Sequence, residues 1–178
     1  MATRKLPEWR PPPHIAELMP DVSGNAVNGL GEAAKRPPTP VMWHRPDRIA
    51  HGRVQKHVND SYESHPLLAG IFDTPERRDR GVPVAEAREE DSAENWTARV
   101  KEFALAHEAD LVGIAPVDPN SVFEGFEVTD PWVVVMGVYM EHANLATAPE
   151  PTAALEVGTQ YNRGHRAAHA LQNWIRGR

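Results

Sequence analysis

The chain has 178 residues, no cysteine and a formal net charge of −6. Without cysteine it forms no disulfide, no cysteine-ligated zinc site and no cysteine-ligated iron–sulfur cluster of its own. Residues 91–178 hold six Lys and Arg against twelve Asp and Glu, so they carry the whole net charge. An acidic segment argues against a nucleic-acid partner, because affinity for phosphate backbones comes mainly from Lys and Arg.

The first half of the chain is rich in proline, since twelve of the 17 prolines precede Asp91. Proline lacks a backbone N–H and disfavours helix at the residue before it. We therefore expect residues 1–90 to form a proline-rich extended or wrapping arm. Gly29-Leu30-Gly31 resembles part of a phosphate-binding loop, but no strand precedes it and no third glycine follows, so an ordinary loop is expected. Histidines without a recognisable ligand spacing are expected at the surface of this arm: His44, His51, His57 and His65.

Two features bear on location. Arg4 and Lys5 are not followed by the apolar core of a signal peptide. The longest apolar stretch, residues 132–140, has the length of a strand rather than of a membrane span. We expect a cytoplasmic protein with no membrane partner.

Regular periodicity begins at Asp91. Asp91 followed at the third position by Glu94 resembles a capping box, which marks the start of a helix. Apolar residues then recur every three or four positions and predict a single buried stripe: Trp96, Val100, Phe103, Ala104 and His107. Residues 110–115 predict a buried strand, and residues 131–140 predict a second strand.

The second strand is β-branched and apolar on both faces, which is typical of a central strand covered on both sides. Between the strands we expect a short turn and a solvated acidic loop that contains Glu124, Glu127 and Asp130. Three tryptophans on the regular elements are expected in the core: Trp96, Trp132 and Trp174.

The last predicted element is a helix over residues 152–176, with Arg163, Arg166 and Gln172 facing outward. Its seam, expected to pack on strand 132–140, repeats at alternating spacings of three and four: Ala154, Val157, Tyr161, Gly164, Ala168, Leu171 and Ile175. The order helix, strand, strand, helix predicts an incomplete α/β domain over residues 91–178, because so small a sheet leaves its edges uncovered. More chain, or a partner chain, is expected to complete it.

His165 and His169 stand four residues apart on this helix, a spacing that can hold a metal ion. Glu141, His142 or Glu156 would have to supply further ligands. The neighbouring Arg163 and Arg166 oppose cation binding, so two solvated surface histidines are the favoured interpretation and no metal site is predicted. No serine-centred nucleophile motif is present, and no catalytic or cofactor-binding residue is assigned.

Residues 92–178 resemble the N-terminal region of the cobalamin-dependent reductive dehalogenase and epoxyqueuosine reductase family. The resemblance lies in the helix with Val100-Lys101-Glu102-Phe103-Ala104, in Ala109-Asp110-Leu111-Val112-Gly113-Ile114-Ala115-Pro116, in Val133-Val134-Val135-Met136-Gly137-Val138, and in the last helix with Tyr161, Gly164 and residues 170–177. It implies an α/β fold with a partial cobalamin-module-like sheet and flanking helices, preceded by the proline-rich irregular arm.

The resemblance also implies a function for a larger assembly. Family members carry two cysteine-rich clusters downstream of this region, so cobalamin and 4Fe-4S clusters are expected in the full assembly and none bound by this chain alone. The expected function is an N-terminal segment or subunit of an oxidoreductase that cleaves carbon–halogen bonds by reduction, with a scaffold role for this chain. Its expected partner is the C-terminal cobalamin/ferredoxin part, in the same or a separate chain. The alternative is a cofactor-free structural or interaction module, a vestigial copy of the cobalamin-binding domain.

Overall fold

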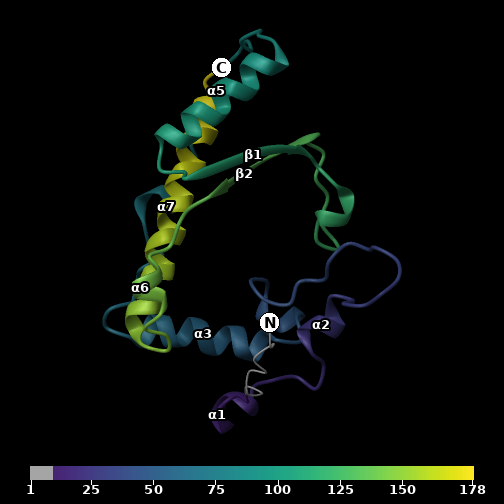
Figure 1. Ribbon diagram of the computed structural model, residues 1–178, viewed down its shortest axis with the longest axis vertical. Coiled ribbons are helices and arrows are strands. Elements are labelled where there is room, and N and C mark those ends of the chain that lie inside the picture. The colour runs from purple at the N-terminus through teal and green to yellow at the C-terminus, as the bar shows by residue number, and fades with distance from the viewer. Residues whose placement is uncertain (1–9) are drawn as a thin grey trace, which may run out of the picture. The chain divides into compact units, whose positions relative to one another are not determined.

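The computed structural model describes residues 10–178, which form a mixed α/β arrangement of helices and one small sheet (Figure 1). The elements in chain order are α1 (Pro13–Ala16), α2 (Gly24–Val27), η1 (Pro46–Arg48), α3 (Gly52–Ser64), α4 (Pro75–Arg78), α5 (Ala93–Ala106), β1 (Leu111–Pro116), η2 (Pro119–Ser121), β2 (Trp132–Gly137), α6 (His142–Leu145) and α7 (Pro151–Arg176).

Contacts divide the chain into two units. Of the described residues, the first contains 10–61 together with Asp118–Val128, and the second contains Tyr62–Val117 and Thr129–Arg178. The sequence placed a boundary between residues 90 and 91, whereas the units divide between residues 61 and 62. Residues 62–90 belong with the helices and strands that follow them.

The first unit has a polar interior. His51 is only 6% exposed and Gln55 is also buried. Gln55 Nε2 donates to the carbonyl of His44 at 2.6 Å, and Gln55 Oε1 accepts from the backbone N–H groups of Trp43 and His44. The expectation that His51 lies at the surface is therefore wrong. This side chain packs beneath Gly24 and Val41, which the irregular sequence around it did not indicate.

Helix α3 was not expected in the proline-rich arm. Residues 47–65 contain no proline, so nothing in the stretch interrupts a helix. Val54, Val58 and Tyr62 recur at a spacing of four, which places them on one face. That weak stripe was the available signal for this helix.

The second unit contains the sheet, in which β1 pairs with β2 in antiparallel register from Leu111 opposite Gly137 to Pro116 opposite Trp132. Both predicted strands are confirmed, with β2 shorter at each end than expected. The expectation that both strands are buried is wrong, because only alternate residues are covered.

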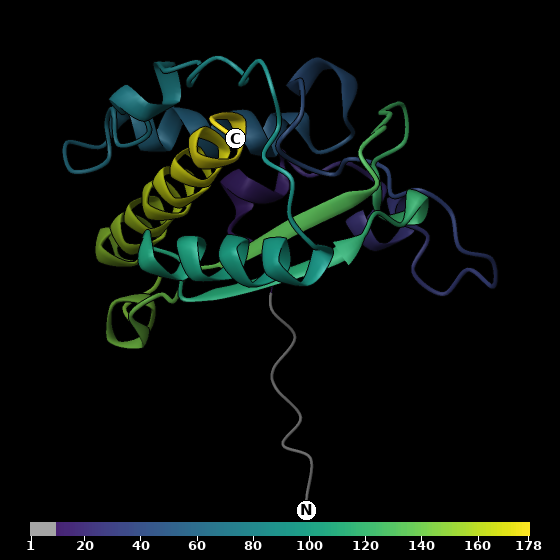
Figure 2. The ribbon, with the colours of Figure 1, turned by 90° about the horizontal axis from the view of Figure 1, so that it is seen from above.

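The core of the second unit lies between α5, α7 and one face of the sheet, whose ribbon runs beside the two helices (Figure 2). Ala104 of α5 and Ala167 of α7 are completely buried, and side chains this small let the two helices approach closely. The remaining core is built by Val100, Ala109 and Leu171, with partly buried Trp96, Phe103, Val112, Ile114, Val134, Met136 and Trp174 packed against them.

Helix α5 is confirmed, but its cap differs from the prediction. Ser92, not Asp91, is the N-cap, and its hydroxyl accepts from the backbone N–H of Asn95 at 3.1 Å. Asp91 lies one residue earlier, where it accepts from the backbone N–H of Ser92 at 2.8 Å and from the Asn95 amide at 2.7 Å. Both residues therefore satisfy donors at this helix start.

Helix α7 begins at Pro151, one residue before the predicted start, and ends at Arg176 as predicted, but part of its predicted seam faces away from the core. Leu171 is 4% exposed, as expected, whereas Tyr161 is 54% and Ile175 is 44% exposed, and Ala168 is exposed as well. Trp132 is also exposed, which corrects its expected place in the core. Trp96 and Trp174 do lie at the core, with their rings 5.9 Å apart.

Candidate functional site

The second unit presents an uncovered apolar sheet face. The inward-facing residues of both strands pack on α5 and α7, while the alternate residues face away from these helices. On that outer face Leu111 is 55% exposed and Val135 is 59% exposed. The six outer positions carry no charged or hydrogen-bonding side chain: Leu111, Gly113, Ala115, Val133, Val135 and Gly137. A sheet that is apolar on both faces is normally covered on both faces.

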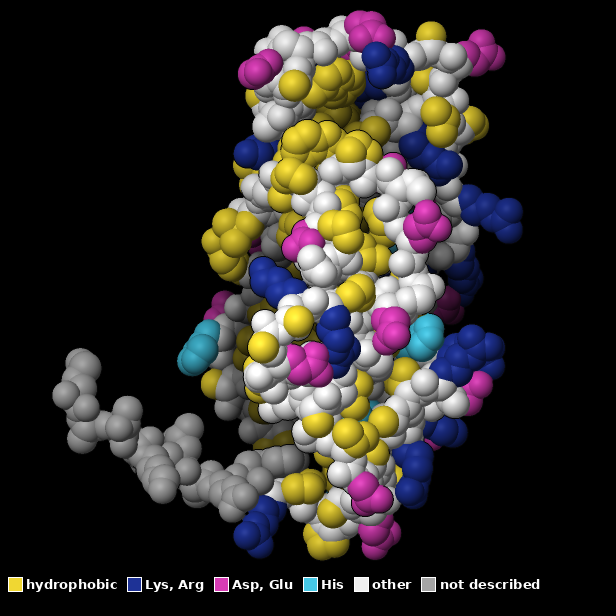
Figure 3. Space-filling view, turned by 90° about the vertical axis from the view of Figure 1, so that its right-hand side faces the viewer, with side chains coloured by type: hydrophobic (Ala, Val, Ile, Leu, Met, Phe, Trp, Pro, Cys, Tyr) yellow, Lys and Arg dark blue, Asp and Glu magenta, His cyan; other side chains and the backbone are white. Residues whose placement is uncertain are grey.

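A second apolar surface lies where α7 passes the end of β2, and we name it the α7 groove. It has a volume of about 480 Å³. Its apolar lining comes from both elements and from the residues after β2, and its polar lining comes from α4 and α7: Met136, Val138, Met140, Tyr161, Gly164 and Ala168, with Arg77, Gln160 and His165. Figure 3 shows that hydrophobic side chains are interspersed with charged ones on one face of the molecule.

His165 and His169 are less exposed than the sequence predicted. Their rings stack with centroids 6.5 Å apart, and the Nε2 atom of each is buried without a hydrogen-bond partner among the described residues. His169 Nε2 lies 3.3 Å from Asp79 Oδ2, in the segment after α4. The expectation of two solvated surface histidines is therefore wrong. Asp79 approaches His169, and Arg77, Met136 and Val138 line the same groove as His165, which are long-range contacts that helical spacing does not report.

Glu156 is a buried carboxylate on α7, with 7% exposure. Its oxygens accept from the backbone N–H of Glu141 at 2.7 Å, from the Asn144 amide at 2.9 Å and from the Gln160 amide at 3.0 Å. These donors, with the Glu141 N–H contributing most, hold the pKa of Glu156 below its usual range. Glu156 therefore fixes the start of α6 to α7 and is satisfied as a structural acceptor.

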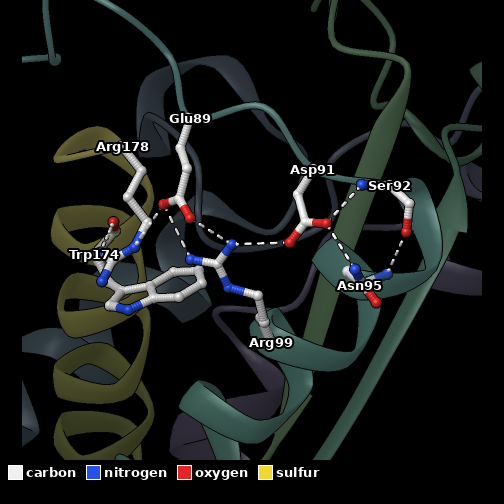
Figure 4. Close-up of polar contacts among 7 residues, drawn as sticks. All are labelled: Glu89, Asp91, Ser92, Asn95, Arg99, Trp174 and Arg178. Carbon is white, nitrogen blue, oxygen red and sulfur yellow. Dashed lines mark hydrogen bonds and ion pairs between the residues drawn. The ribbon is translucent and has the colours of Figure 1, made fainter.

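A charged clamp, which we name the Arg99 clamp, joins α5 to the end of α7 (Figure 4). Arg99 Nη1 lies 2.7 Å from Glu89 Oε1 and 3.1 Å from Asp91 Oδ2. Its guanidinium also lies 4.4 Å above the Trp96 ring and 5.6 Å from that of Trp174. The hydrogen bond from Arg99 is the main reason that the pKa of Glu89 is lowered.

The clamp holds an extended strap, residues 80–91, along the last turns of α7. The backbone N–H of Ala85 donates to the carbonyl of Arg176 at 2.7 Å, and that of Glu89 donates to the carbonyl of Arg178. Such carbonyls at a helix end have no partner inside the helix. A pocket of about 410 Å³ lies between the strap and the helices, lined on its apolar side by Trp96, Val100 and Ile175. Sequence periodicity could not indicate the strap, because it has none.

The remaining sequence candidates lie in exposed loops. Glu124, Glu127 and Asp130 are exposed as expected, and Glu124 Oε2 accepts from the Thr39 hydroxyl at 3.1 Å. Gly29-Leu30-Gly31 forms a turn with positive φ at both glycines, and its leucine points into solvent. The loop interpretation of both segments is confirmed.

Two searches of the described part of the chain, residues 10–178, bear on cofactors and membranes. Within it, no three His, Asp or Glu side chains come together in a way that could hold a metal ion. Within the same residues no helix combines the length and apolarity needed to cross a bilayer.

No protein-family model, no curated protein and no solved structure matches this chain. Its function is therefore inferred from the residues and contacts described above.

Proposed function

We propose that this chain is a scaffold segment or subunit of a reductive-dehalogenase-like oxidoreductase. The observation that supports the proposal is the outer face of the β1–β2 sheet, which is apolar at all six positions and exposed at all of them except Gly137. Within residues 10–178 each strand also has one partner, so its other edge is open to pairing. An uncovered apolar face with free edges is what one part of a divided α/β sheet presents to the rest of its assembly.

The catalytic part of this proposal comes from the sequence resemblance in residues 92–178. The whole assembly would replace a carbon–halogen bond by a carbon–hydrogen bond, which consumes two electrons and one proton and releases halide. The electrons would pass from 4Fe-4S clusters to cobalamin. Because this chain has no cysteine, both clusters need ligands from the remaining cobalamin/ferredoxin part, in the same or a separate chain. We propose that the assembly is cytoplasmic.

The test starts from the DNA that follows the codon for Arg178 and from the neighbouring genes. An open frame with two four-cysteine motifs would be produced together with this chain, and the purified complex would be analysed for cobalt, iron and sulfide. Halide release from a halogenated aromatic, with reduced methyl viologen as the electron donor, would then be measured. We expect a complex that contains both cofactors and releases halide. A complex without cobalt or iron, or a locus without such a frame, would contradict the proposal.

A second candidate is a cofactor-free interaction module. The observation that favours it is the closed construction of the second unit, in which α5, α7 and one sheet face share a continuous core and the Arg99 clamp holds the helix ends. Such a unit has the contacts to fold without a cofactor. Cooperative unfolding of the isolated chain, with no change in midpoint on addition of cobalamin, would favour this candidate if the locus also lacks the cysteine motifs.

A further inference from the structure

The α7 groove carries one cation that no carboxylate neutralises. The guanidinium of Arg77 lies 5.3 Å above the Phe72 ring and has no carboxylate within 4.0 Å among the described residues. The two arginines of α7 that lie near the groove are both paired, Arg163 with Asp110 at 2.7 Å and Arg166 with Glu108 at 2.6 Å. Among the described residues no Asp or Glu lines the groove, although residues 91–178 are acidic overall. The groove lining thus presents one arginine without a carboxylate partner.

The groove is also apolar and open along one stripe of α7. Tyr161 is largely exposed, Ala168 is exposed, and Gly164 lies between them on the same face. A Cβ built on Gly164 would meet its nearest atom, Val138 Cγ2, only at 3.8 Å, so this floor is not tightly filled. These residues belong to the 3-4 seam that the sequence marks as a packing surface, yet the core of the unit lies elsewhere. Small residues between larger ones allow another backbone to approach a helix closely.

We propose that the α7 groove binds an apolar helical segment of a partner protein that places an Asp or Glu side chain against Arg77. The apolar residues of the segment would cover Tyr161, Gly164 and Ala168, and its carboxylate would supply the missing counter-charge. A second copy of this chain fits less well. In a two-fold dimer the same patch faces itself, which would bring two Arg77 side chains together without a carboxylate between them.

The test uses the full chain and two fluorescently labelled synthetic helical peptides. Both carry the same Leu and Ala stripe, and they differ only in that one has Glu where the other has Lys beside the stripe. Fluorescence anisotropy at low salt gives both dissociation constants. We expect the Glu peptide to bind roughly two- to fivefold more tightly, the size of effect that an exposed charge pair produces.

The decisive variant is Arg77→Glu, which should reverse the preference so that the Lys peptide binds more tightly. Arg80→Glu is the matched control, because it makes the same change in net charge at an exposed arginine outside the groove, and it should leave the preference as in the wild type. Tyr161→Ala should weaken both peptides alike. Unchanged circular dichroism spectra establish that each variant is folded.

Three outcomes would overturn the inference. Equal affinity for the two peptides would show that Arg77 does not select a carboxylate. The same conclusion would follow if Arg77→Glu and Arg80→Glu changed the peptide preference to the same extent. Failure of both peptides to bind would remove the groove as a docking site. Sedimentation showing a dimer that Tyr161→Ala dissociates would assign the groove to a second copy. The peptides carry no cofactor, so none of these results depends on whether the proposed oxidoreductase assembly exists.

Discussion

Arg163 of α7 donates from Nη2 to Asp110 Oδ1 at 2.7 Å, which ties the long helix to the residue that precedes β1. The other oxygen, Oδ2, accepts from the backbone N–H of Tyr139 at 2.7 Å. One carboxylate therefore joins the helix, the start of β1 and the chain that leaves β2. Its pKa lies below the usual range, first because of the Arg163 hydrogen bond and then because of the Tyr139 N–H.

Replacing Asp110 by Asn should lower the stability of the second unit at neutral pH. Because the pKa of Asp110 is lower in the folded than in the unfolded chain, its contribution is present above the unfolded value of about 4 and is lost as the pH falls through the folded value. Urea unfolding should therefore give a lower midpoint for Asp110→Asn at pH 7, and the gap to the wild type should narrow as the pH falls below about 4.

Asp130→Asn is the control for this experiment, because Asp130 is an exposed loop carboxylate in the same unit. Its midpoint should follow that of the wild type at every pH. A gap between Asp110→Asn and the wild type that stays constant with pH would show that the charge of Asp110 does not carry the effect.

The position of α7 could be predicted from the sequence, but the face that it buries could not. Its bounds follow from unbroken helical spacing after Pro151. Two apolar stripes then compete, and the predicted one runs through Tyr161, Ala168 and Ile175. The structure buries the other, through Ala153 and Ala167, with Leu171 common to both. Periodicity does not predict which of two apolar stripes is buried, because burial depends on which side chains are small enough to fit against α5.

Contacts between distant segments account for most of what sequence reasoning missed in the site. Residues 80–91 have no periodicity, and they are held by α7 carbonyls some ninety positions later in the chain. The shielding of His165 and His169 and the isolation of Arg77 likewise depend on how α4 lies against α7. The local features were accessible, since the strands follow from continuous apolar, β-branched runs and the exposed loops from glycine and charge.

The burial of Leu171 and the exposure of Ile175 predict unequal costs of truncation. Leu171→Ala should lower the free energy of unfolding by about 2–5 kcal/mol, the usual range when a buried leucine leaves a cavity. Ile175→Ala should cost less than Leu171→Ala, about 1 kcal/mol, because 44% of Ile175 is already exposed and its removal opens no enclosed cavity. Chemical denaturation measures both. Equal losses of unfolding free energy in the two variants would support the seam predicted from the sequence, in which both side chains are buried.

Two glycines of α7 should respond differently to alanine. A Cβ at Gly164 would meet nothing closer than Val138 at 3.8 Å, so Gly164→Ala should stabilise the chain by about 0.5–1 kcal/mol through helix propensity. A Cβ at Gly158 would overlap Ile71 Cδ1, so Gly158→Ala should gain less than this or destabilise.

Ile71→Ala removes the overlapping atoms and provides the control. In a double-mutant cycle measured by thermal or chemical denaturation, the cost of Gly158→Ala should shrink in the Ile71→Ala background. If Gly158→Ala has the same effect in both backgrounds, the close approach of Ile71 to α7 is not what selects glycine there.

The Arg99 clamp predicts how firmly the strap of residues 80–91 is held. Arg99→Met keeps an unbranched apolar stem and removes the guanidinium, with its hydrogen bonds to Glu89 and Asp91 and its contact with the Trp96 ring. Local opening of the strap should then become more frequent, and the amide of Ala85, which donates to the Arg176 carbonyl, should exchange with deuterium roughly three- to tenfold faster.

Arg88→Met is the matched control, because Arg88 is an exposed residue of the same strap whose one ion pair within the described part of the chain is with Glu90. It should leave the exchange of the Ala85 amide within experimental error of the wild type. An acceleration equal to that in Arg99→Met would show that the clamp is not what holds the strap.

Acidification tests the same contact independently. The pKa of Glu89 is lowered chiefly by Arg99, so its contribution is complete above the ordinary glutamate value of about 4.3 and is lost as the pH falls through the folded value. After correction for the intrinsic exchange rate, the protection of the Ala85 amide should decrease in the wild type as the pH is lowered. In Arg99→Met it should change much less.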